Sequence, residues 1–134
     1  MKRLFMATVL ACAAAFAHAE SGWVNIASTG LNDMLWDVKS GSLEFTKTKG
    51  GAVIAVVIGR ITNTKTSRID LYKWYVSAID CKKQIGKVVT LDIDGTYKFE
   101  NDFVFGSGNV ATAMAEAICG AADYSIKKVD EKSL

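Results

Sequence analysis

The ten residues AVIAVVIGRI, at positions 52–61, form the most apolar segment that follows the first 20 residues of the chain. Most of them are Val or Ile, whose β-branched side chains favour a strand over a helix. Because apolar and polar residues do not alternate here, we predict a strand that is covered on both faces. One face would pack on the core. The other would be covered by a helix or loops of the same chain, or by another subunit, and the sequence leaves these alternatives open.

Turn signals flank this strand on both sides. A Lys-Gly-Gly hairpin connection at 49–51 precedes it, and a polar turn at 63–67 follows it. After the second turn we predict a long strand over 68–81. Strand alternation places Tyr72 and Trp74 on one face of that strand and Cys81 on the other.

Shorter strands surround these two in the sequence. Alternating or β-branched patterns predict them at 23–27, 34–38, 42–47, 87–93 and 96–99, the last two joined by an Asp-Gly turn.

One helix is predicted after the leading segment, over 110–119. Its apolar positions follow helical spacing, at Val110, Ala113, Met114, Ala117 and Ile118. Asn109 or Ser107 can cap its start, and Gly120 stands where a left-handed residue usually ends a helix. Strands followed by one helix predict an α+β fold: an antiparallel sheet of about six strands with one C-terminal helix packed on one face.

The first 19 residues have the pattern of a secretory signal peptide. Lys2 and Arg3 precede an apolar run, and Ala17-His18-Ala19 is a small-x-small cleavage site. Cleavage there leaves one domain at 20–120 and a polar tail at 121–134, which is expected to fray. The protein is then periplasmic, held at the outer-membrane surface or secreted. A lipid anchor at Cys12 is the weaker alternative, because Leu10 fits a lipobox poorly and the preceding apolar run is short.

Cysteine count and export together predict a disulfide. Beyond the predicted signal the chain has two cysteines, Cys81 and Cys119. An even number in an exported chain indicates a bridge, which would pin the helix to the end of the long strand. No other apolar run approaches the ~20 residues that a membrane span requires.

Charge and residue inventory exclude several classes of function. Beyond residue 19 the chain has 14 acidic and 14 basic residues, so it lacks the basic excess of a nucleic-acid binder. The single histidine, His18, leaves with the signal, which removes His-based catalysis and imidazole metal ligation. No cofactor is implied.

One acidic cluster remains, at Asp92, Asp94, Glu100 and Asp102. Calcium prefers such oxygen ligands, but the spacing does not match an EF-hand, so a solvated hairpin is the preferred interpretation and no metal site is predicted. A small hydrolase that uses Asp92 or Asp94 is the weakest functional alternative.

Aromatic residues give the best candidate for a binding surface. Tyr72 and Trp74 lie opposite the cysteine face of the long strand, and Lys82 and Lys83 follow as part of a basic rim. If the helix covers the cysteine face, the aromatic face is exposed, and exposed aromatic patches mark partner surfaces.

The order of features resembles the surface-adhesin protein E family of Gram-negative bacteria over roughly residues 22–120. The shared features are an early Trp23, Trp36-Asp37 followed by Ser40, the strand end Ile79-Asp80-Cys81, Gly-Ser-Gly at 106–108 and the helix end Ala117-Ile118-Cys119. The resemblance implies a small exported domain with bridged cysteines that binds host matrix or plasma proteins. This chain departs from the family in its poor lipobox and in a longer connection over 42–51.

Together these observations predict an exported, non-enzymatic binding module, such as a surface adhesin, with a host or envelope protein as partner. A periplasmic inhibitor or accessory factor is the alternative. A homodimer through the sheet is also predicted, in which Val56 and Trp74 lie at the interface.

Overall fold

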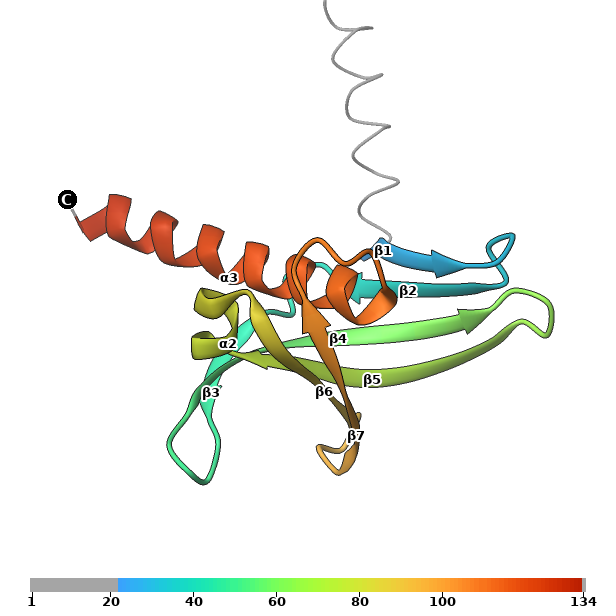
Figure 1. The fold of residues 1–134 in the computed structure, drawn as a ribbon, viewed down its shortest axis with the longest axis horizontal. Coiled ribbons are helices and arrows are strands. Elements are labelled where there is room, and N and C mark those ends of the chain that lie inside the picture. Colours follow the sequence, from blue (N-terminus) through green and yellow to red (C-terminus); the bar gives the residue numbers. More distant parts are fainter. Residues whose placement is uncertain (1–21, 134) are drawn as a thin grey trace, which may run out of the picture.

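A computed structural model describes residues 22–133 as one antiparallel sheet with a long C-terminal helix (Figure 1). The predicted signal peptide and Cys12 lie outside the described residues. The α+β class is confirmed. The seven strands are β1 (Trp23–Thr29), β2 (Met34–Lys39), β3 (Glu44–Lys47), β4 (Val53–Asn63), β5 (Arg68–Ser77), β6 (Ile85–Asp92) and β7 (Tyr97–Val104).

The apolar segment at 52–61 is the centre of this sheet. It forms most of β4, which pairs with β5 from Ile54 to Asn63. On its other edge, β3 pairs with residues 53–56 and β2 with residues 59–63. The order of the sheet is therefore β1-β2-β4-β5-β6-β7, with β3 beside the first half of β4. Residues on both faces of the first half of β4 are buried, at Ile54, Ala55, Val56 and Val57, which agrees with its apolar sequence.

The helix α3 (Val110–Ser133) lies across one face of the sheet (Figure 1). Asn109 caps its start, because the Asn109 Oδ1 accepts a hydrogen bond of 2.8 Å from the Thr112 N–H. The Thr112 hydroxyl, which is buried, donates to the Val104 carbonyl at 3.0 Å. These bonds fix the first turn of α3 to the end of β7 and so set the face on which the helix lies.

The core lies between α3 and the sheet. Its helix residues are spaced by three and four positions, at Met114, Ala115, Ile118, Cys119 and Ala122, and its strand residues include Ala55, Val57, Trp74, Val76, Val88 and Phe103. The buried stripe of α3 is therefore rotated slightly from the predicted one, since Ala113 and Ala117 are only half-buried.

The predicted end of this helix is wrong. Helical structure continues through Gly120 to Ser133, and Gly120 does not adopt a left-handed conformation. Glycine inside a helix costs about 1 kcal/mol relative to Ala. Ala122 lies three positions beyond Cys119 of the disulfide and packs in the core, so continuing the helix buries one more residue.

The predicted strand over 68–81 is too long. β5 ends at Ser77, and residues Ala78–Lys83 form the short helix α2. The Ser77 hydroxyl caps α2 by accepting from the Asp80 N–H at 3.1 Å, and Gln84 ends it in a left-handed conformation. A Ser with an acidic residue three positions later is a known helix-start signal that the alternation of apolar residues concealed.

The disulfide prediction is confirmed. Cys81 and Cys119 are bonded, with a Cα–Cα distance of 5.4 Å. Because Cys81 belongs to α2 and not to β5, the bridge joins α3 to α2. The two helices of the described residues are each too short or too polar to cross a membrane.

Candidate functional site

The predicted aromatic surface at Tyr72 and Trp74 does not exist as an exposed patch. Trp74 is 0% exposed, under α3, and Tyr72 is half-buried against it with ring centroids 6.5 Å apart. The prediction failed because α3 covers the face of β5 that carries Trp74. Cys81 belongs to α2 and not to β5, so its disulfide does not hold α3 on the opposite face of that strand. Trp74 therefore cannot lie at a dimer interface.

Lys82 and Lys83 are exposed in the last turn of α2. Lys82 borders a cavity of about 470 Å³ beside the disulfide, which is a different hollow from the one next to Trp74. The structure therefore does not bring the two lysines and the two aromatic residues into one site.

The acidic residues of the β6–β7 hairpin are divided between several contacts. Asp92 pairs with Lys98 at 3.2 Å, and the Lys87 Nζ lies 2.7 Å from Asp102 and 3.2 Å from Glu100. Within the described residues these groups do not form a cluster that could hold a metal ion.

Asp94 stabilises the turn of that hairpin. The Thr96 N–H donates to its Oδ1 at 2.9 Å, and this bond holds the pKa of Asp94 below its usual value. Its role is therefore that of a turn residue.

A polar cluster links three strands near the start of the domain. The Asp37 carboxylate is buried and accepts from the Arg60 Nε at 2.9 Å and from the Asn25 Nδ2 at 3.0 Å. The Arg60 guanidinium also lies over the Trp23 ring, 4.4 Å from its centroid. Trp23 and Asp37 are both features of the family resemblance. Each contacts the Arg60 side chain, and these contacts stabilise the packing of the three strands.

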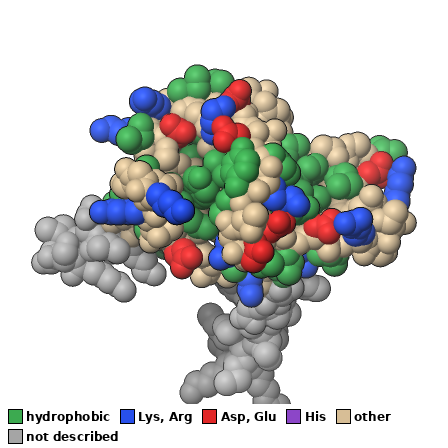
Figure 2. All heavy atoms as spheres, turned by 90° about the horizontal axis from the view of Figure 1, so that it is seen from below, with side chains coloured by type: hydrophobic (Ala, Val, Ile, Leu, Met, Phe, Trp, Pro, Cys, Tyr) green, Lys and Arg blue, Asp and Glu red, His purple; other side chains and the backbone are tan. Residues whose placement is uncertain are grey.

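The face of the sheet turned away from α3, which we name the open face, carries apolar residues from five strands. Paired residues in an antiparallel sheet share a face. The register therefore places together Leu35, Ile54, Val56, Ile58, Ile69, Leu71, Tyr75, Val89, Leu91 and Tyr97. Figure 2, seen from below Figure 1 and so from the side away from the helix, shows hydrophobic side chains gathered in the middle and charged groups around them.

The edges of the open face are its most accessible parts. Ile69, Leu71 and Tyr97 are 54%, 47% and 56% exposed, whereas Val56 in the centre is buried. Partial burial raises the pKa of Tyr75, and the negative charge of Glu100 raises it further. Val56, which was predicted at a dimer interface together with Trp74, lies on the face that the helix leaves uncovered, with Ile54 and Ile58, whereas Trp74 lies on the covered face.

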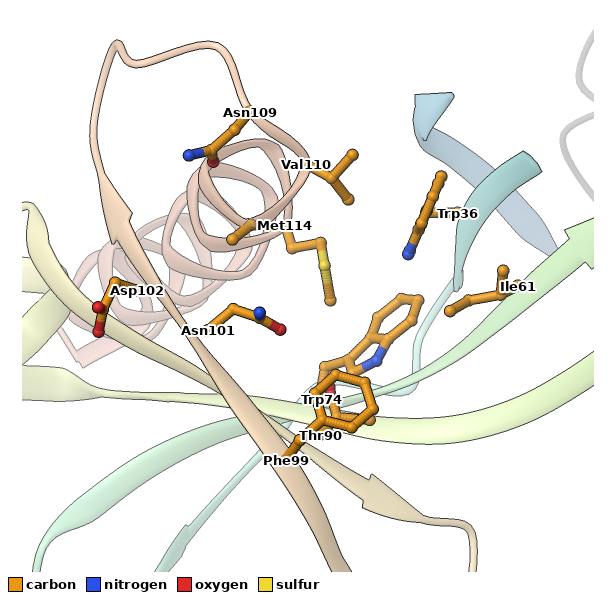
Figure 3. Close-up of a pocket in the computed structure, with 11 residues that line it drawn as sticks. Trp36, Ile61, Trp74, Thr90, Phe99, Asn101, Asp102, Asn109, Val110 and Met114 are labelled. Carbon is orange, nitrogen blue, oxygen red and sulfur yellow. The ribbon is translucent and has the colours of Figure 1, made fainter. Parts of the chain in front are cut away.

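A second candidate is a pocket of about 440 Å³ between the first turns of α3 and the sheet (Figure 3). Trp74 lies at its base, Trp36 and Ile61 lie on one side, and the Met114 side chain projects toward it from the helix. Reasoning from sequence missed this pocket, because its lining comes from six separate elements, β2, β4, β5, β6, β7 and α3.

No family model matches this chain, and neither the curated proteins nor the solved structures contain a match.

Proposed function

We propose that the protein is an exported, non-enzymatic binding module that binds another protein through the open face of its sheet. The observation that carries this proposal is the group of apolar side chains on that face, which extends over β2, β4, β5, β6 and β7 around one lysine, Lys73, paired with Ile58 and Leu91. Monomeric soluble proteins rarely leave such a surface in water, and larger exposed patches mark interaction sites.

The chemistry of the open face suits a protein partner. Tyr75 and Tyr97 supply aromatic area, which is enriched at protein interfaces. Charged groups of both signs border it, with Arg60 and Asp37 at one end and Lys87 with Glu100 at the other. Bordering charges give orientation and specificity more than affinity, so the partner that fits is a protein with an apolar patch flanked by charges of both signs.

The family resemblance supports the same class of function and an extracellular partner such as a host matrix protein. A periplasmic inhibitor or accessory factor would use the same surface on another envelope protein. Protease treatment of intact cells separates the two, because a surface adhesin is digested and a periplasmic factor is protected.

Site-specific photo-crosslinking tests the proposed surface. A crosslinker at Leu71 should give one discrete heavier product in the cells that export the protein, and a crosslinker at Lys65, in the exposed β4–β5 turn, should not. A product of twice the monomer mass that also forms with the purified protein would assign the face to a second copy of this chain. No product from Leu71 would refute the proposal.

A further inference from the structure

The strand β7 forms an outer edge of the sheet, since within residues 22–133 only β6 pairs with it. Its register with β6 is continuous over residues 99–104. Of the other outer strands, β1 has a register shift in its middle and β3 has only four residues. An edge strand presents unpaired main-chain N–H and C=O groups to any extended segment beside it, and β7 has the longest regular edge of the three.

Two sets of hydrogen bonds show which main-chain groups of β7 point away from β6. The Phe105 N–H donates to the Gln84 carbonyl at 3.0 Å, so Phe105 points toward the neighbouring segment. This direction alternates along an antiparallel strand, so Val104 points outward. The Thr112 hydroxyl occupies these outward groups, because it accepts from the Val104 N–H at 3.4 Å and donates to the Val104 carbonyl at 3.0 Å.

The same alternation turns the main-chain groups of Asp102 and Glu100 outward. Both residues follow Val104 at steps of two within the continuous register. Among residues 22–133, no hydrogen bond takes up the outward N–H and C=O groups of these two residues. Both residues are exposed, so an extended segment can reach them and add a strand to the sheet.

The side chains at this edge select the charge of an added strand. The Lys87 Nζ lies 3.2 Å from Glu100 and 2.7 Å from Asp102, so two carboxylates share one ammonium group and one negative charge is left over. Opposite charges on paired residues of neighbouring strands are stabilising, and like charges are destabilising. Basic residues opposite Glu100 and Asp102 are therefore favoured. A second copy of β7 is disfavoured, because antiparallel self-pairing through these groups sets carboxylates opposite each other.

The pocket between β7 and the first turns of α3 lies next to this edge. The exposed Asn101, the half-buried Val110 and Phe99, which is 45% exposed, all line it. Asp102 also lines it although its carboxylate points away, so the pocket reaches the main chain at the edge (Figure 3). Asn101 lies on the opposite face of β7 from Asp102. An apolar residue opposite Asn101 in an added strand therefore lies at the pocket mouth, near Phe99 and Val110.

From these observations we propose that the outer edge of β7 binds an extended peptide segment of another protein as an additional strand. The main chain of the segment bonds to the N–H and C=O groups of Glu100 and Asp102. Basic residues of the segment lie beside these two carboxylates, and the apolar residue between them enters the pocket. Main-chain bonds supply the affinity of such a site, and pockets for alternate side chains supply its specificity. The site does not use the apolar residues of the open face.

Binding of the terminally blocked peptide Val-Lys-Val-Lys-Val to the purified, disulfide-bonded protein tests the proposal by ¹⁵N NMR. The amide signals of Glu100 and Asp102 should shift at millimolar peptide, and these amides should exchange with deuterium more slowly. The amide signals of β1, at the other end of the sheet, should not shift. Shifts confined to other residues, or no shift at millimolar peptide, would overturn the proposal.

Methylated peptides distinguish strand addition from simple attraction of charge. N-methylation of either lysine removes an N–H that faces β7, and should weaken binding at least about fivefold, the loss of one hydrogen bond. N-methylation of the central valine, whose N–H points away from β7, should leave binding nearly unchanged. Equal binding of the two methylated peptides would show that no strand is added.

Charge reversal at the edge tests the choice of partner. The double variant Glu100→Lys, Asp102→Lys should bind Val-Lys-Val-Lys-Val about tenfold more weakly and should prefer Val-Glu-Val-Glu-Val. Leu71→Lys, on the open face, should bind the first peptide as the wild type does, whereas it should weaken a complex formed through the open face. Unchanged preference of the double variant would refute this site without affecting the proposed role of the open face.

Discussion

Replacing Gly59 with Ala should destabilise the protein, because the side chain of Trp74 occupies the space that a methyl group would need. A Cβ added at Gly59 would overlap Cζ3 and Cε3 of Trp74 and lie 2.6 Å from its Cη2. Trp74 is 0% exposed, so the ring can yield only toward the pocket beside it. Gly59 adopts an ordinary β conformation, so the backbone itself tolerates Ala.

The expected magnitude combines two opposing terms. Overpacking of a core costs typically about 1–3 kcal/mol, and this close overlap belongs at the upper end. Ala in place of Gly recovers about 0.4–1 kcal/mol through the unfolded state. The net loss is about 2 kcal/mol, which for a domain of this size lowers the Tm by roughly 8 °C.

Thermal and urea unfolding with the disulfide intact measure this loss. Gly120→Ala is the matched control, because no atom lies within 4 Å of the added methyl and the residue is inside α3, where Ala should stabilise by roughly 0.5–1 kcal/mol. Combining Gly59→Ala with Trp74→Phe tests the cause, since a smaller ring should reduce the cost of the methyl. An equal cost in both backgrounds, or no loss at all, would refute the reasoning.

Three further perturbations follow from the described contacts. Asp37→Ala should cost about 2–3 kcal/mol in urea unfolding, because it leaves Arg60 without its carboxylate partner in a partly buried position, and a change below about 0.5 kcal/mol would contradict this. Asp94→Ala should lower the Tm at pH 7: the folded-state pKa of Asp94 is below its usual 3.8, so its stabilisation is present above that value and is lost as pH falls through the folded pKa. The Tm values of this variant and the wild type should therefore converge in acid, and a constant difference would exclude the carboxylate as the cause. Replacing both cysteines with Ser should cost about 4 kcal/mol, from the 38-residue separation of Cys81 and Cys119, and an unchanged denaturation midpoint would show that the bridge is not stabilising.

Local patterns along the chain were sufficient for much of the fold. The apolar run at 52–61 correctly predicted a central strand, and its residues from Ile54 to Val57 are buried whichever face they lie on. The cysteine count predicted the disulfide, and Asn109 was among the two predicted caps of the C-terminal helix. These features depend on residues that are close in sequence or few in number, so the sequence alone determines them.

The candidate sites depend on which face of the sheet α3 covers, and that choice was predicted wrongly. β4 and β5 carry apolar residues on both faces, so periodicity cannot distinguish the covered face from the open one. Contacts between distant residues decide it: Gly59 leaves room for the ring of Trp74, and Thr112 bonds to Val104 so that α3 begins above that ring. The open face and the pocket are the two consequences. Both arise from how volumes and hydrogen bonds match across the sheet, which only the tertiary structure decides.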